Sequence, residues 1–258
     1  MSVADEILRI QQAKEDLKTA IEAKGVTVPA ATTIDGYAAL VDQIQQGGGT
    51  LPYDAGIAYL ESTGTQYIDT GIKPSGISNI RVVTSVECSN ANRRVILGSF
   101  STANAGDKGL SIEIQKDSTN NKLRLYTINN TSAVNFMDTH SLTLNKPINI
   151  DITLNCASNT WSGTLSNNNS SYNISASASS GMDTQLRNFR LYLDHRASTS
   201  VIAYPLKMYF LKIYIDNQMV RHFIPVRVGT TGEMYDKVSQ TLFGNLGTGS
   251  FVLGPDVT

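Results

Sequence analysis

Two carboxylates in the stretch Y-L-E-S-T-G-T-Q-Y-I-D-T-G, residues 59–71, could form a catalytic or ligand-binding pair. Glu61 and Asp69 flank a polar turn, and paired carboxylates can divide the acid and base roles of a reaction. A structural interpretation competes. If S-T-G-T is a turn, its flanks form a hairpin in which the carboxylates need not face each other, and Asp69 can accept backbone hydrogen bonds at Thr70-Gly71. We favour the structural interpretation.

Four other residues have the chemistry of a sugar-binding site, which combines an aromatic face with a few fixed polar groups. They are Trp161, the only tryptophan, in S-N-T-W-S-G, and Tyr126, Tyr192 and Asp194, in or beside strand-like segments. Each aromatic residue also has a structural interpretation, because tryptophan is commonly buried and strand tyrosines commonly line a sheet. Both interpretations stay open for all three aromatic residues.

The sequence contains no recognisable motif for a metal site or for a catalytic nucleophile. His140, His195 and His222 are far apart in the sequence and lack metal-ligand spacing, and there is no P-loop, G-x-S-x-G or C-x-x-C. No run of alternating Asp or Asn resembles a calcium loop. Cys88 and Cys156 are expected to be free thiols, with a disulfide as the alternative. We therefore predict no metal and no cofactor.

Composition limits the classes of partner. The chain has 258 residues and a net charge of −1, and its Lys and Arg residues form no basic stripe, so a nucleic-acid partner is not expected. The start M-S-V-A-D-E has neither a basic nor an apolar leader region, so no secretory signal is expected. No apolar run approaches the roughly 18 residues of a membrane span, and we expect no membrane insertion.

Residues 4–46 have helical periodicity. Ile7, Ile10, Leu17 and Ile21 recur at three- and four-residue steps, with Lys14 interrupting the stripe. This helix should end at Lys24-Gly25, a cation followed by a glycine.

A second helix should begin with Thr32 as its N-cap and Asp35 completing a capping box. Its apolar residues are Ile34, Tyr37, Val41 and Ile44.

A hairpin of this size cannot bury enough surface to stand alone. Its partner could be the other domain, a larger assembly, or copies of itself, although only about two heptads are available for a coiled coil. We assign residues 1–46 to a helical attachment or oligomerisation module and residues 47–52, with their glycine run and Pro52, to a flexible linker.

From residue 53 to residue 258 the pattern becomes that of short strands. Runs such as I-N-I-D-I-T-L (148–154) alternate apolar with polar residues, and Asn-, Ser- and Asp-rich breaks such as S-N-N-N-S-S separate them. About a dozen strands of this kind predict a mainly β fold, an antiparallel two-sheet jelly-roll sandwich.

The two ends of this domain resemble a known family. YLESTGTQYIDTGI (59–72) is similar to the opening of concanavalin-like, laminin-G-like domains of gut bacterial surface proteins and their phages. Residues 211–251, with R-x-F-I-P-x-R, Y-D-x-V-S and F-x-N-x-G-T-G-x-F, resemble the closing block of those domains. The resemblance implies that Tyr59 and Tyr67 are anchoring aromatics and that the first strand lies near Phe251–Leu253.

The N-terminal pattern I-x-x-A-K-x-x-L-K-x-A-I-x-A-K-G-V-x-V-P, followed by I-D-G-Y-A-A-L-V-D-Q-I, resembles short helical modules that open many tailed-phage virion proteins. Together the resemblances imply a fibre or decoration protein on the surface of a phage particle.

Hydrolases of the concanavalin-like fold carry E-x-D-x-x-E, or a variant one residue different, on one strand. The nearest match is S-I-E-I-Q-K-D, in which Glu113 and Asp117 are an even four positions apart and could share a strand face, but the middle carboxylate is missing. We therefore expect a protein that is not an enzyme.

The expected function is display of a lectin-like domain that adheres to host-surface polysaccharide, with several heads acting together. The helices would bind other virion proteins or form a homo-oligomer, a trimer by analogy with fibres. The main alternative is a structural adaptor whose sandwich binds neighbouring virion proteins; a glycan-degrading enzyme and a bacterial surface adhesin are the lesser ones.

Overall fold

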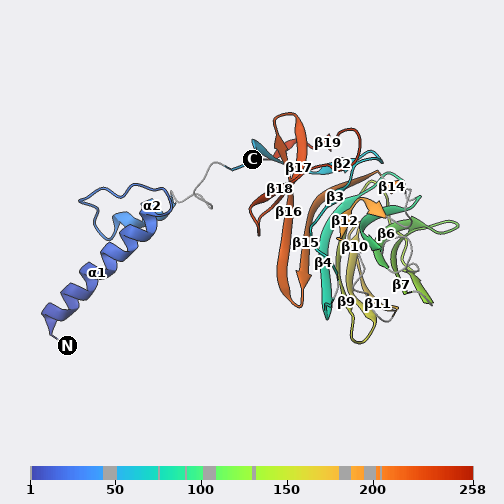
Figure 1. Ribbon diagram of the computed structural model, residues 1–258, viewed down its shortest axis with the longest axis horizontal. Helices are drawn as coiled ribbons and strands as arrows, with labels where there is room; N and C mark the ends of the chain where they lie inside the picture. Colours follow the sequence, from blue (N-terminus) through green and yellow to red (C-terminus); the bar gives the residue numbers. More distant parts are fainter. Residues whose placement is uncertain are drawn as a thin grey trace. The chain divides into compact units, whose positions relative to one another are not determined.

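The computed structural model describes residues 2–42, 51–74, 76–90, 92–100, 109–129, 132–179, 187–194, 202–203 and 205–257. The chain forms two compact units, Met1–Pro52 and Tyr53–Thr258. The first unit is helical and the second is built from strands (Figure 1). Residues 47–50 of the predicted linker, which include its glycine run, lie outside the described residues, as does Ile44.

Helix α1 (Val3–Glu22) begins with a capping box. The Ser2 hydroxyl accepts a hydrogen bond from the Asp5 backbone N–H at 3.2 Å, and the Asp5 carboxylate accepts one from the Ser2 N–H at 2.8 Å. The helix ends at the Ala23 C-cap, before Gly25 adopts a left-handed φ of +82°. The predicted stop at Lys24-Gly25 is confirmed.

Helix α2 (Gly36–Asp42) begins later than the sequence pattern predicted. Thr32 is not its N-cap, because the Thr32 hydroxyl donates to the Pro29 carbonyl at 2.7 Å instead of accepting from the backbone of the next turn. The Thr32 N–H donates to the same carbonyl, so this threonine closes a turn after Pro29.

The apolar residues of the two helices divide into a buried group and an exposed group. Ile21 and Tyr37 are buried together with Val28, which holds the two helices against the connecting segment. The remaining predicted stripe residues within the described part are exposed: Ile7, Ile10, Leu17, Ile34 and Val41. The helical unit therefore uses only part of its apolar surface internally.

Two antiparallel sheets form the second unit. Among the described residues the larger sheet has 12 strands, and its main path follows the order β11 (Ser170–Ser177), β10 (Thr160–Asn167), β9 (Ile148–Asn155), β4 (Asn79–Glu87), β15 (Leu206–Ile215), β16 (Gln218–Val228), β1 (Ala55–Ile57) and β20 (Asp256–Val257). Four short strands join it off this path: β2 (Leu60–Ser62), β17 (Thr231–Asp236), β18 (Thr241–Phe243) and β19 (Val252–Leu253).

The second sheet has six strands in the order β3 (Ile68–Asp69), β12 (Arg190–Leu191), β5 (Arg94–Phe100), β6 (Gly109–Lys116), β7 (Asn121–Asn129) and β8 (Ser132–Met137). A separate two-stranded ribbon pairs β13 (Leu193–Asp194) with β14 (Ile202–Ala203).

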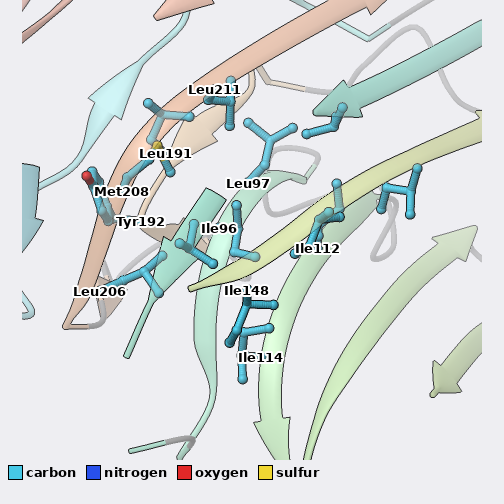
Figure 2. Packing of buried hydrophobic residues seen from close by; sticks show 14 of the residues in the cluster. Ile96, Leu97, Ile112, Ile114, Ile148, Leu191, Tyr192, Leu206, Met208 and Leu211 are labelled. Atoms are coloured by element: carbon cyan, nitrogen blue, oxygen red, sulfur yellow. The ribbon is translucent and has the colours of Figure 1, made fainter. Parts of the chain in front are cut away.

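The core lies between the two sheets and follows the alternation of the strands. In β9 the apolar residues from Ile148 to Leu154 are buried, and the polar residues between them face outward. Figure 2 shows Leu97 and Ile112 of the six-stranded sheet packed in one cluster with Met208 and Leu211 of the larger sheet. The predicted class, a mainly β two-sheet jelly-roll sandwich preceded by helices, is confirmed.

The opening strand of the sandwich pairs with a closing strand, as predicted. Leu60 of β2 lies opposite Leu253 of β19, and Glu61 lies opposite Val252. The hairpin expected around S-T-G-T is wrong, because β2 joins the larger sheet whereas β3 joins the six-stranded sheet. This turn carries the chain from one sheet of the sandwich to the other.

Candidate functional site

Two of the predicted glycan-binding residues lie in the core. The Trp161 side chain is 2% exposed and belongs to the cluster between the sheets. Tyr192 is fully buried, its hydroxyl donates to the Leu60 carbonyl at 2.8 Å, and burial raises the pKa of this hydroxyl well above its usual value. The structural interpretation of both residues is therefore the correct one, because a ligand cannot reach them.

Tyr126 is also buried, on the face of β7 that points away from the core. The Arg124 guanidinium lies 4.6 Å from the centre of the Tyr126 ring and donates to Asn135 at 2.6 Å. Asp194 lies in β13, and its side chain is outside the described part of the structure. The four predicted residues are thus not gathered into one site.

Glu113, the carboxylate nearest to a hydrolase pattern, is held in a buried ion cluster. Arg93 contacts both of its oxygens, at 2.9 and 3.0 Å, and Arg124 contacts one at 2.8 Å, while the Ser111 hydroxyl donates a further hydrogen bond. Burial raises the pKa of Glu113, but the two guanidiniums and Ser111 outweigh it, and the pKa lies below its ordinary value. Glu113 is therefore an ionised structural partner without a proton to donate near neutral pH.

Asp117 does not form a pair with Glu113. Its carboxylate accepts from the backbone N–H groups of Thr119 and Asn120, at 3.0 and 2.9 Å, and lies 2.8 Å from the Lys122 ammonium. These are the contacts of a residue that stabilises the turn between β6 and β7.

Asp69 likewise has a structural role. Its carboxylate accepts from the Gly71 N–H and from the Asn188 side-chain amide, each at 2.9 Å. The structural interpretation of Asp69 is confirmed.

The side chains with the most suitable binding chemistry lie on the face of the larger sheet that points away from the core. Lys207 of β15 lies directly between Glu61 of β2 and Glu87 of β4 in the strand register. Its neighbours in β15, Leu206 and Met208, are buried in the core, so Lys207 and its two partners point outward. Because cross-strand neighbours on one face are within contact distance, the three charges form a row.

Two tyrosines complete this group, which we call the outer-face cluster: Tyr59, Glu61, Glu87, Lys207 and Tyr209. Glu87 accepts from the Lys207 ammonium at 3.0 Å and from the Tyr209 hydroxyl at 2.9 Å. The Tyr59 and Tyr209 rings meet edge to face at 6.0 Å, and the Lys207 ammonium lies 4.9 Å from the centre of the Tyr59 ring. Both rings are half-buried, which fixes them and leaves part of each accessible.

The charges in the outer-face cluster stabilise one another. Burial raises the pKa of Glu87, but hydrogen bonds from Lys207 and Tyr209 and the charges of Lys207 and Lys146 outweigh it and hold the pKa below its ordinary value. The hydrogen bond to Glu87 raises the pKa of Lys207, and burial together with Glu87 raises the pKa of Tyr209 to about 12. At neutral pH the cluster therefore presents an ionised Glu87, a charged Lys207 and a neutral Tyr209.

A cleft of about 490 Å³ lies on the same face. We call it the polar cleft, and its lining residues are Lys146, Pro147, Asn149, Ser166, Asn167, Asn168, Asn169, Ser170 and Ser171. Asn149 of β9 is paired with Ser85 of β4, which lies two residues before Glu87 and so shares its face. Because Lys146 also influences Glu87, the cleft and the outer-face cluster are electrostatically connected.

The sequence patterns considered above, aromatic residues beside polar groups and acidic residues close together in the chain, identify neither the outer-face cluster nor the polar cleft. The signal that was present is the alternation in L-K-M-Y of β15, in which Lys207 and Tyr209 fall between buried Leu206 and Met208. Their partners Tyr59 and Glu87 come from other parts of the chain, so only the sheet order could join them.

The cysteines, the possible metal ligands and the helices bear on the remaining expectations from the sequence. Cys88 and Cys156 are free thiols, as expected. Within the described residues no three His, Cys, Asp or Glu side chains are grouped in a way that could hold a metal ion. In the same part of the chain, no helix is long and apolar enough to cross a membrane.

Solved structures that are similar to this chain include a Bacteroides protein and a Limulus pentraxin. One is a protein from Bacteroides ovatus ATCC 8483 described as a candidate carbohydrate-binding protein; it is 10% identical, with a TM-score of 0.51 over 79% of this chain. The match covers 61% of that protein, so this chain spans less than two thirds of its length. The other is a heptameric SAP-like pentraxin from Limulus polyphemus, 9% identical, with a TM-score of 0.44 over 78% of this chain and 90% of the pentraxin.

No protein-family model and no curated protein sequence matches the chain. At about a tenth sequence identity, the similarity to the Bacteroides protein is a similarity of fold. The second unit of this chain is a jelly-roll sandwich.

Proposed function

We propose that the sandwich binds carbohydrate through the outer face of its larger sheet and is not an enzyme. The observation that carries the proposal is the outer-face cluster, where two half-buried tyrosines are fixed beside an ion pair on an accessible surface. Sugar sites need this combination of an aromatic surface and a few oriented polar groups. The similarity in fold to a candidate carbohydrate-binding protein supports the same proposal.

The outer-face cluster matches the two faces of a sugar ring. The accessible part of a tyrosine ring can pack against the apolar C–H face of a pyranose. The Glu87 carboxylate has lone pairs left for sugar hydroxyls, and the Lys207 ammonium has donors left, because each uses only some of its hydrogen-bonding capacity in the pair. The side chains are already held in place, so binding orders few of them.

We further propose that the protein is a structural component of a phage particle that displays this domain on its surface. The support is the resemblance of residues 10–29 to helical modules of tailed-phage virion proteins, and of the two ends of the sandwich to domains of gut bacterial surface proteins and their phages. The exposed residues Ile7, Ile10 and Leu17 of α1 would attach the helix to another virion protein or to copies of itself, a trimer in our proposal. Several weakly binding heads on one particle would gain avidity.

Binding of the full-length protein to an array of bacterial surface polysaccharides tests the carbohydrate proposal. Tyr209→Ala removes the ring and the hydrogen bond to Glu87, and we expect at least a tenfold loss of affinity for any polysaccharide that the wild type binds. Tyr67→Ala is the matched control. Tyr67 is also half-buried and has a cationic partner, Arg190, 5.3 Å from the centre of its ring. It adjoins β3 of the other sheet, outside the outer-face cluster.

Three outcomes would contradict the proposal. If the wild type binds no polysaccharide, the sandwich is better explained as an adaptor for neighbouring virion proteins. If Tyr67→Ala reduces binding as much as Tyr209→Ala does, the outer-face cluster is not the site. If the protein releases reducing sugar and Glu113→Gln abolishes that release, it is an enzyme.

A further inference from the structure

We propose that the polar cleft selects a carboxylated sugar residue, such as a hexuronic acid, and that Lys146 is the residue that recognises its charge. This inference rests on the proposed carbohydrate binding and specifies the class of sugar. A neighbouring residue of the same glycan chain would then lie on the outer-face cluster.

One wall of the polar cleft is tied in place by a buried side chain. Asn167 is 5% exposed, and its amide oxygen accepts from the Thr143 N–H at 2.7 Å. The amide nitrogen of Asn167 donates to the carbonyls of Thr143 and Pro147, at 3.2 and 3.0 Å. These three bonds fasten the segment that carries Lys146 to the end of β10, so the position of the lysine backbone is defined before a ligand binds.

The tight turn between β10 and β11 also lines the polar cleft. Asn168 and Asn169 both have left-handed φ values, +50° and +64°, which is the geometry of a two-residue hairpin turn. Both asparagines are exposed, so their amides can donate to and accept from sugar hydroxyls. On the adjoining sheet face the Asn149 amide donates to the Ser166 hydroxyl at 3.4 Å, which leaves capacity on both groups for a ligand.

The charge of the lining points to an anionic ligand. Lys146 is the only ionisable residue among those that line the polar cleft; the others are asparagine, serine and proline. Within the described part of the chain, Lys146 is exposed and has no ion pair. The nearby Glu87 is already paired with Lys207 and bonded to Tyr209, which reduces its repulsion of a bound carboxylate.

The size and polarity of the cleft fit a saccharide. A volume of about 490 Å³ lies within the roughly 300–1,000 Å³ of small-ligand sites. Amides and hydroxyls surround the single cation, so a small inorganic anion would leave most of the lining without a partner, whereas a carboxylated sugar offers both a charge and several hydroxyls.

A pair of polysaccharides that differ only in charge tests the inference: polygalacturonate and the same polymer after reduction of its carboxyl groups to hydroxymethyl groups. With full-length protein at low salt, we expect the acidic form to bind about tenfold more tightly than the reduced form, the size of effect that one partly desolvated charge pair can give. Lys146→Gln should remove this preference, so that the acidic and reduced forms bind this variant equally.

The controls separate recognition from general attraction between charges. Lys237→Gln removes an exposed lysine in the turn between β17 and β18 and should keep the full preference. Poly-glutamate, an acidic polymer without sugar hydroxyls, should bind at least tenfold more weakly than polygalacturonate. A preference that persists in Lys146→Gln, or equal binding to poly-glutamate, would overturn the inference.

The failures of the two proposals can be distinguished. If both polygalacturonate and its reduced form bind equally, and Tyr209→Ala weakens both, carbohydrate binding stands and selection of an acidic sugar is wrong. If neither these polymers nor any polysaccharide on the array binds, the carbohydrate proposal itself is wrong.

Discussion

Replacing Asp236 with asparagine should destabilise the sandwich far more than replacing an exposed aspartate. Asp236 is fully buried at the end of β17, in the Y-D-x-V-S segment. One carboxylate oxygen accepts from the backbone N–H groups of His222 and Val238, at 2.7 and 3.1 Å. The other accepts from the N–H and hydroxyl of Ser239, at 3.1 and 2.7 Å, and lies 3.5 Å from an Arg221 nitrogen.

The size of the effect follows from the number of donors that asparagine cannot serve. Whichever way its amide points, the NH₂ group faces donors that the carboxylate had accepted from, and each buried group left unsatisfied costs about 1–3 kcal/mol. The charge facing Arg221 is lost as well, and breaking a buried ion pair costs about 3–5 kcal/mol. Because the two contributions describe the same carboxylate and overlap, we expect a loss of about 3 kcal/mol, the lower end of the range for a broken buried ion pair. This is a large fraction of the roughly 5–15 kcal/mol stability of a domain.

Asp151→Asn is the matched control. Asp151 makes a two-point ion pair with Arg81, at 2.7 and 2.6 Å, but the two side chains are 38% and 45% exposed. An exposed pair of this kind contributes about 0–1 kcal/mol.

The single tryptophan makes the assay simple. Because Trp161 is buried in the sandwich core, its fluorescence reports the unfolding of that domain during a urea titration. Asp236→Asn should lower the urea midpoint without changing the slope of the transition, and should lower Tm by about 6–12 °C for a domain of this size. If the two variants differ by less than about 0.5 kcal/mol in their free energy of unfolding, the buried carboxylate does not have the stabilising role that we assign to it.

Two further predictions concern the outer-face cluster and the helices. The folded protein holds the pKa of Glu87 below its ordinary 4.5, so the stability that ionised Glu87 contributes should be complete above pH 4.5 and lost as the pH falls further. The difference in free energy of unfolding between the wild type and Glu87→Gln, measured by urea titration at several pH values, should therefore shrink below pH 4.5. A difference that does not depend on pH would contradict this prediction. If α1 self-associates, the double variant Ile10→Lys, Leu17→Lys should have a lower mass in light scattering than the wild type, because both replaced residues are exposed and apolar. Gln12→Lys, at another exposed position of α1, should leave the mass unchanged. A multimer of unchanged mass in the double variant would refute self-association.

The alternation of apolar and polar residues was sufficient to predict the fold class, because the buried face of a strand can be recognised from neighbouring residues alone. The alternation of Ile148 to Leu154 predicts one buried face, and β9 has that face. The start of α2 was not predictable from the same kind of pattern. Thr32 had two competing uses for its hydroxyl, capping the next helix or bonding to Pro29, and the structure has the second.

The candidate site was less predictable, because it depends on which strands become neighbours. Trp161 has the composition of a sugar-binding residue, but it lies on the inward face of β10. Lys207 and Tyr209 become candidates only when the sheet order places Glu61 and Glu87 on either side of β15. Strand order depends on contacts between distant segments, and single-sequence patterns do not contain it.

The opening segment (59–72) and the closing segment (211–251), whose patterns indicate the fold, are in direct contact. The Thr65 hydroxyl donates to the Thr248 carbonyl at 2.7 Å, and Asn245 accepts from the Tyr67 N–H at 3.2 Å. Any side chain at Gly247 would place its Cβ 1.9 Å from the Thr65 carbonyl oxygen, so this close approach requires glycine.

The opening segment nevertheless has two roles, divided by the alternation of its first strand. Leu60 points into the core and lies opposite Leu253 of the closing strand, so it contributes to the fold. Tyr59 and Glu61, on either side of Leu60, point to the opposite face and join Lys207 in the outer-face cluster. Substitutions at Tyr59 should therefore affect ligand binding more than stability, and substitutions at Leu60 should affect stability first, because burying a leucine contributes about 2–5 kcal/mol relative to alanine.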